Sequence, residues 1–167
     1  MSILTFGSLA LGLLLFAVPP QRPPADPADP TTWTATAVVA GRPVRAGDAF
    51  RVRLTLTVKE GWYVYAVSQG PGGPIPMSVS LRGLQRLELS GNVVEPEPHV
   101  ARDAALKIES RTHAGRVTFG VPIRVKKDAP SGTTRLTIEV EYQACTKTLC
   151  LQPMTKVVTI PVTVASF

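Results

Sequence analysis

The sequence has few of the residues that carry most enzyme chemistry. Its 167 residues include only two histidines and two cysteines, and aromatic residues make up 6% of the chain. His99 and His113 are isolated in the sequence, so their spacing predicts neither a metal site nor a cofactor. No nucleophile-elbow motif is present, and no Lys-Ser/Thr pair follows the glycine-rich residues 70–76. These patterns do not support hydrolase or phosphate-binding chemistry.

Acidic residues are outnumbered by basic ones, 12 to 18, which gives a formal net charge of +6. The basic residues are scattered, however, and the longest basic run is Lys126-Lys127. No aromatic residues are interleaved with that run, as they would be in a surface that stacks on bases. We therefore predict no nucleic-acid partner and interpret the excess charge as a solvated basic surface.

Only one long hydrophobic run is present, at residues 3–18. It is shorter than the ~20 residues of a spanning helix and is typical of the apolar part of a secretory signal. We predict a signal peptide over residues 1–20 and a periplasmic or otherwise extracytoplasmic location. No Lys or Arg precedes the run and no A-x-A cleavage site follows it, so a short uncleaved anchor stays open as the alternative.

Six prolines and no large apolar residue occupy residues 19–30. Such a segment cannot pack a core, and we predict an extended proline-rich spacer over residues 21–30. The folded domain is then expected to cover residues 31–167.

Apolar and polar residues alternate in the long segments of this domain. Leu54 and Ile138 are expected to face the core, and Arg53 to face solvent. The strongest predicted strands cover residues 50–58, 117–125, 136–142 and 158–164, and weaker ones 34–39, 62–67, 77–81 and 87–94. About eight short antiparallel strands with Gly/Pro turns predict an all-β sandwich.

The only cysteines, Cys145 and Cys150, are separated by four residues between two predicted strands. Facing residues at the base of such a hairpin have Cα atoms roughly 4.5–5.5 Å apart, within the range of a disulfide. Two readings stay open: a structural staple and a redox-active pair. Closing so short a loop contributes only about 2 kcal/mol, which weakens the staple reading. The alternation of residues 136–142, continued to Cys145, predicts that this residue faces outward, where a partner could reach it.

The residues around the cysteines resemble a known family. Tyr-Gln-Ala-Cys at residues 142–145, followed by Cys-Leu-Gln-Pro-Met-Thr-Lys at residues 150–156, is similar to the amino-terminal periplasmic domain of the thiol:disulfide interchange protein DsbD. Glu-Gly-Trp-Tyr-Val-Tyr at residues 60–65 is a second similar segment. The resemblance implies an immunoglobulin-like sandwich in which Cys145 and Cys150 are the catalytic redox pair.

The same resemblance implies the partners. They would be thioredoxin-like redox proteins and a membrane electron conduit, both supplied by separate proteins because the 167 residues hold neither. It also implies a loop that shields the cysteines, within residues 99–107, although no aromatic residue is present there. The alternative is a non-catalytic binding or scaffold module with a permanent disulfide, because a fold does not determine a function.

Overall fold

The computed structural model describes residues 28–39, 43–83, 86–102 and 108–166, and these residues form strands but no helix. None of them therefore provides a helix that could cross a membrane. The predicted signal peptide, and most of the predicted spacer, lie outside the described residues. The strands are β1 (Thr31–Val38), β2 (Ala49–Val58), β3 (Tyr63–Tyr65), β4 (Ser78–Leu81), β5 (Leu87–Leu89), β6 (His99–Arg102), β7 (Glu109–His113), β8 (Arg116–Val125), β9 (Gly132–Tyr142), β10 (Ala144–Cys145) and β11 (Met154–Val164).

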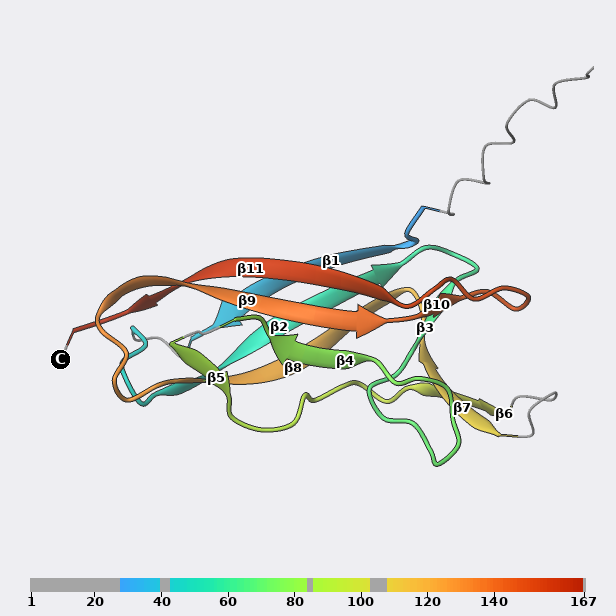
Figure 1. Cartoon of the computed structure of the whole chain (residues 1–167), viewed down its shortest axis with the longest axis horizontal. Helices are drawn as coiled ribbons and strands as arrows, with labels where there is room; N and C mark the ends of the chain where they lie inside the picture. The colour runs from blue at the N-terminus through green and yellow to red at the C-terminus, as the bar shows by residue number, and fades with distance from the viewer. Residues whose placement is uncertain (1–27, 40–42, 84–85, 103–107, 167) are drawn as a thin grey trace, which may run out of the picture.

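Two antiparallel sheets form the body of the molecule (Figure 1). One has the strand order β1-β2-β8-β5 and the other β11-β9-β4. A third, smaller sheet, β10-β3-β7-β6, lies at the end of the sandwich opposite the C terminus (Figure 1). The predicted antiparallel β-sandwich is thus confirmed, and the cysteine-bearing strand β10 belongs to the small sheet rather than to either large one.

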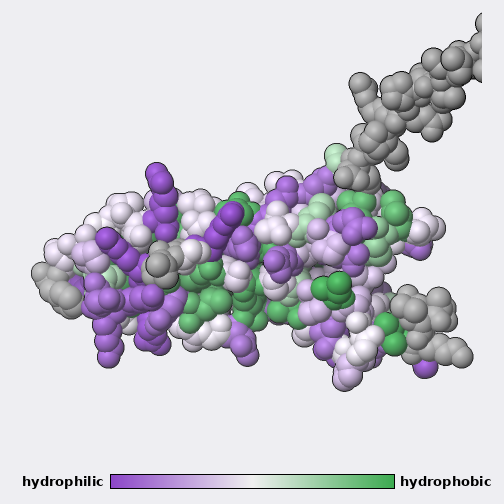
Figure 2. Space-filling view, in the orientation of Figure 1, coloured by the Kyte–Doolittle hydropathy of each residue, from purple (hydrophilic) through white to green (hydrophobic). Residues whose placement is uncertain are grey.

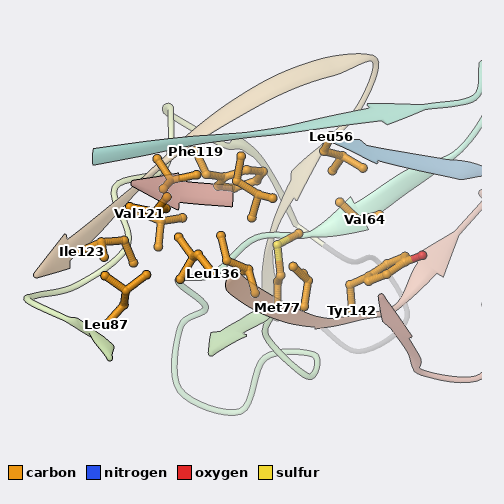
Figure 3. Close-up of a cluster of buried hydrophobic side chains, with 14 of the residues drawn as sticks. Leu56, Val64, Met77, Leu87, Phe119, Val121, Ile123, Leu136 and Tyr142 are labelled. Carbon is orange, nitrogen blue, oxygen red and sulfur yellow. The ribbon is translucent and has the colours of Figure 1, made fainter. Parts of the chain in front are cut away.

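The core lies between the two large sheets and follows the predicted alternation. Leu54, Phe119 and Ile138 are fully buried, whereas Arg53 is exposed. Figure 3 shows this cluster continuing toward the small sheet through Val64 and Tyr142. Burying each large apolar side chain contributes roughly 1.5–3 kcal/mol, so the alternation is the main determinant of the sandwich.

Candidate functional site

The cysteine hairpin begins where β9 ends. Tyr142 is the last residue of β9, Gln143 belongs to no strand, and Ala144 and Cys145 then pair with Val64 and Tyr63 of β3. Because β3 lies in the small sheet, the chain changes sheets at Gln143.

A disulfide joins Cys145 and Cys150 across the hairpin. The sulfur atoms are 2.03 Å apart, and the Cα atoms are 4.0 Å apart, somewhat closer than the predicted 4.5–5.5 Å. The pairing expected from the four-residue spacing is therefore present in the structure.

The predicted outward direction of Cys145 is wrong. Its exposed fraction is 0%, whereas Cys150 is exposed. The prediction continued the alternation of β9 through position 143, but the chain leaves β9 there, and both Ala144 and Cys145 become buried against the small sheet. The accessible cysteine of the pair is therefore Cys150.

The loop between the cysteines is closed by its own hydrogen bonds. The Thr146 amide donates to the Leu149 carbonyl (2.7 Å), and the Thr146 hydroxyl accepts from the amides of Thr148 and Leu149 (3.2 and 3.1 Å). At the base of the hairpin, the Leu151 amide donates to the Ala144 carbonyl (2.9 Å). Because these bonds do not involve sulfur, they can hold the loop when the disulfide is open.

Tyr65 lies beside the accessible sulfur. Its hydroxyl oxygen is 3.8 Å from the Cys150 Sγ, and its ring packs edge-on against Tyr63 at a centroid distance of 6.0 Å. A phenolic hydroxyl can donate a hydrogen bond to sulfur. The contact depends on the pairing of β3 with β10, so the sequence pattern alone does not reveal it.

A polar cluster secures the end of β9 just before the cysteines. The Tyr142 hydroxyl donates to Asp29 Oδ2 (2.9 Å), and Lys156 Nζ lies 2.7 Å from the same oxygen. Burial raises the pKa of Tyr142 to about 12. Burial also tends to raise the pKa of Asp29, but hydrogen bonds from Lys156, Thr31 and Tyr142 hold it below its usual value. Asp29 is therefore a carboxylate that ties the start of the domain to the strand leading to Cys145.

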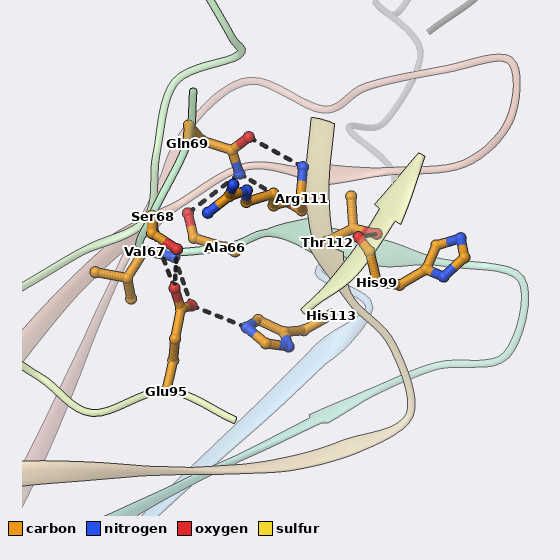
Figure 4. A network of polar contacts seen from close by, with 9 residues as sticks. All are labelled: Ala66, Val67, Ser68, Gln69, Glu95, His99, Arg111, Thr112 and His113. Atoms are coloured by element: carbon orange, nitrogen blue, oxygen red, sulfur yellow. Dashed lines mark hydrogen bonds and ion pairs between the residues drawn. The ribbon is translucent and has the colours of Figure 1, made fainter. Parts of the chain in front are cut away.

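A second carboxylate, Glu95, connects segments of the small sheet through hydrogen bonds (Figure 4). It accepts hydrogen bonds from the Val67 and Ser68 amides (both 2.9 Å) and from the Ser68 hydroxyl, and its Oε2 lies 3.0 Å from Nε2 of the buried His113. His113 in turn pairs with Val64 of β3. Burial tends to raise the pKa of Glu95, but these hydrogen bonds keep it below its usual value. Glu95 thus joins the segment after β3 to β7.

An apolar surface lies beside the hairpin. A cavity of about 250 Å³ is lined by Ile75, Tyr142, Gln143, Pro153 and neighbouring residues. Ile75 is 63% exposed and so extends an apolar side chain into solvent next to this cavity.

The predicted shielding loop is only partly described. Residues 99–102 form β6, whose four residues are all exposed, and residues 103–107 lie outside the described part of the chain. Shielding of the cysteines by this segment therefore stays a prediction. Within the described residues, no group of three or more His, Cys, Asp or Glu side chains could hold a metal ion.

Comparison with known proteins identifies the family of the chain. The family model for the thiol:disulfide interchange protein DsbD, N-terminal, matches residues 33–161, which include the whole cysteine hairpin. The chain belongs to this family. No curated protein sequence matches it.

Two solved structures resemble the DsbD amino-terminal-type domain described here. The Neisseria meningitidis DsbD amino-terminal domain in its reduced form has a TM-score of 0.50 and 14% sequence identity, over 78% of this chain and 85% of that one. The amino-terminal periplasmic domain of ScsB from Proteus mirabilis has a TM-score of 0.51 and 17% identity, over 81% of this chain and 47% of that one. At these identities the likeness concerns the fold, which is immunoglobulin-like.

Proposed function

We propose that this DsbD amino-terminal-type domain is a thiol–disulfide exchange module that relays reducing equivalents between thioredoxin-like proteins through Cys145 and Cys150. The observation that carries the proposal is the asymmetric disulfide at one end of the sandwich, with Cys145 buried and Cys150 exposed. A partner's thiolate can reach only an exposed sulfur, so this arrangement determines which atom is attacked first.

In the reducing step, a partner thiolate attacks the Cys150 Sγ. A mixed disulfide forms between the partner and Cys150, while the bond between Cys150 and Cys145 breaks and Cys145 leaves as a thiolate that takes up a proton. The partner's second thiol then attacks the mixed disulfide. The partner is oxidised to a disulfide, and Cys145 and Cys150 become a dithiol. When the reduced domain passes its electrons on, the Cys150 thiolate attacks a substrate disulfide and forms a mixed disulfide with the substrate. Cys145 then attacks Cys150, which releases the reduced substrate and restores the Cys145–Cys150 disulfide.

The surroundings of Cys150 support this sequence of steps. Tyr65 places a hydrogen-bond donor at the sulfur that is alternately attacked and attacking. Leu149, directly before Cys150, is 51% exposed, and Ile75 is 63% exposed. Exposed apolar side chains near a reactive group are typical of a protein-docking surface, and here they provide a contact area for a partner whose thiol must approach Cys150.

The location we propose is extracytoplasmic. Disulfides persist in oxidising compartments such as the periplasm, and the ScsB domain of the same fold is described as periplasmic. The apolar segment at residues 3–18 agrees with export. A membrane electron conduit is the proposed source of electrons, and thioredoxin-like proteins are the proposed carriers.

Mixed-disulfide trapping tests the order of attack. Cys145→Ser leaves the exposed Cys150 thiol. It should attack a thioredoxin-like protein that keeps one active-site cysteine, held as a mixed disulfide with a chromophoric thiol, and form a stable protein–protein disulfide while the chromophoric thiolate is released. Cys150→Ser leaves only the buried Cys145, and it should react much more slowly. Equal reactivity of the two variants would contradict the assignment of Cys150 as the entry point.

The reduction potential separates the relay from a scaffold with a permanent disulfide. A relay should equilibrate with thioredoxin-like proteins, whose potentials lie at roughly −120 to −270 mV, whereas structural disulfides lie below about −300 mV. Equilibration of the wild-type protein with thioredoxin, read by thiol alkylation, gives this value. A disulfide that stays oxidised against excess reduced thioredoxin would support the scaffold instead.

A further inference from the structure

Basic side chains gather at the end of the sandwich that lies farthest from the cysteines. This end holds the start of β2, the last residues of β8 and the loops beside them, on the same side as the C terminus in Figure 1. In the same orientation, Figure 2 shows hydrophilic side chains projecting from this end. We define the basic end by six residues: Arg45, Arg51, Arg53, Arg124, Lys126 and Lys127.

Three of these cations share one face of a sheet. Arg51 and Arg53 alternate with the buried Val52 on β2, so both point outward. Arg124 on β8 pairs with Ala49 of β2, two positions from Arg51 and on the same face. The side chains are fixed on the outer surface because the opposite face of both strands is core.

The backbone beside this face leaves room for Arg51. The position that a Cβ would take on Gly120 lies 3.1 Å from Arg51 Cδ, so a larger residue at position 120 would press on the arginine. Gly120 also pairs with Val94 through two backbone hydrogen bonds of 2.9 and 2.7 Å. Arg51 is therefore held against the sheet by its neighbours, with its guanidinium at the surface.

The six cations of the basic end outnumber the described carboxylates beside them, which are Asp48, Glu88 and Asp128. None of the six cations forms an ion pair with a carboxylate in the described part of the chain, although Glu88 lies opposite Arg124 in the β5–β8 register. Arg124 donates instead to the backbone carbonyl of Gly47 (3.4 Å).

Two of the cations nearer the cysteines have carboxylate partners, whereas Lys147, between the cysteines, has no ion pair among the described residues. Lys156 pairs with Asp29 at 2.7 Å, and Arg111 pairs with Glu109 at 3.2 Å.

We propose that the basic end binds the anionic phospholipid surface of a membrane, with the cysteine hairpin directed away from it. The six cations are spread over a sheet face and adjoining loops, and most of them are exposed. A fluid surface whose headgroups rearrange can match such a spread of long side chains, and each Lys or Arg near an anionic membrane adds to the attraction. This docking leaves Cys150 facing the aqueous phase, and it does not depend on the proposed exchange chemistry.

Vesicle co-sedimentation of the protein without its apolar residues 3–18, which would themselves bind any vesicle, tests the proposal. The protein should bind phosphatidylcholine vesicles that contain phosphatidylglycerol more tightly than vesicles of phosphatidylcholine alone, and added salt should weaken the difference. Arg51→Gln combined with Arg53→Gln should weaken binding to the anionic vesicles by at least about tenfold. The matched control combines Lys59→Gln with Arg102→Gln, which removes the same charge elsewhere and should leave binding unchanged.

Three outcomes would overturn the proposal. They are equal binding to the two kinds of vesicle, equal loss in the two double variants, and binding to soluble polyglutamate without binding to anionic vesicles. The last result would assign the basic end to an acidic protein instead. Replacing both cysteines with serine should leave vesicle binding intact, so failure of the exchange function and failure of lipid binding give different results.

Discussion

The two cysteines of the hairpin differ in their exposure to solvent. Cys145 is enclosed by the small sheet, while Cys150 lies at the surface beside the Tyr65 hydroxyl. In the proposed exchange, an incoming thiolate therefore meets Cys150, and the sulfur that leaves is the buried one. A buried thiolate is poorly solvated, so the departure of Cys145 has to be accompanied by the uptake of a proton.

Tyr65→Phe tests the hydroxyl at Cys150. The substitution keeps the ring that packs against Tyr63 and removes the oxygen 3.8 Å from the sulfur. When the reduced domain attacks a substrate disulfide, Cys150 is the thiolate. A hydrogen bond to a charged group contributes about 1.5–3 kcal/mol, so the reaction of the reduced domain with an oxidised thioredoxin-like protein should slow by roughly tenfold or more. Stopped-flow measurement of the exchange rate checks this, with Tyr63→Phe as the control. Equal rates in Tyr65→Phe and the wild type would show that the hydroxyl takes no part.

Glu95→Gln tests the carboxylate that joins β7 to the segment after β3. The pKa of Glu95 is lower in the folded protein than its ordinary value of 4.5, so its stabilising effect is present above that value and is lost as the pH falls through the lower, folded-state pKa. At neutral pH the variant should lose about 1–3 kcal/mol of unfolding free energy, because Gln keeps only one acceptor oxygen and turns its NH2 group toward donors that bind the second carboxylate oxygen in Glu95. This loss should shrink in acid.

Urea denaturation of both proteins at several pH values measures the effect of Glu95→Gln. Glu97→Gln is the matched control, because Glu97 is exposed on the same segment. If the unfolding free energies of the wild type and Glu95→Gln differ by the same amount from neutral to acidic pH, the ionised form of Glu95 is not the source of the stabilisation.

Among the strands, those that bury one face can be predicted from the sequence, and those that do not cannot. The long strands β2, β8, β9 and β11 each bury one face, so their alternation is visible in the sequence and gives the sandwich. The short strand β6 has four exposed residues and no such pattern. β10 has two residues and depends on its pairing with β3, which is a tertiary contact. The identity of the cysteine pair could therefore be predicted, but not which of its members is accessible.

Substitutions on opposite faces of β2 test this assignment. Leu54→Ala should cost about 2–5 kcal/mol of unfolding free energy, because Leu54 is fully buried in the core, and Ile138→Ala on β9 should cost a similar amount. Arg53→Ala, on the exposed face, should stay within about 0.5 kcal/mol. Chemical denaturation of the three variants provides the measurement. Comparable losses for Arg53→Ala and Leu54→Ala would contradict the strand faces described here.

At the scale of the whole molecule, the start of the domain and the cysteine hairpin lie at the same end. β1 begins beside the small sheet (Figure 1), and Asp29, two residues before it, is bonded to Tyr142 and Lys156. Tyr142 is three residues from Cys145, so the amino-terminal segment is attached close to the disulfide. Asp29, in the predicted spacer, thus takes part in the hydrogen bonds of the folded domain.

Asp29→Ala should lower the unfolding free energy by about 1–3 kcal/mol, because Tyr142 loses a buried acceptor and Lys156 loses its ion pair. Asp128→Ala is the control. Asp128 lies in an exposed turn, and its substitution should change stability by no more than about 0.5 kcal/mol. Equal stability of the two variants would remove Asp29 from the folded network.

This network also limits where the exported chain can be cut. The apolar residues 3–18 predict removal of a signal peptide, and the bonds of Asp29 require that the mature protein keep this residue. We expect amino-terminal sequencing of the protein from its native host to give a first residue between positions 18 and 28. An intact Met1 on a membrane-associated protein would replace the signal with an anchor. A first residue beyond Asp29 would mean that the folded domain does not need the contact between its amino-terminal segment and the strand that leads to Cys145.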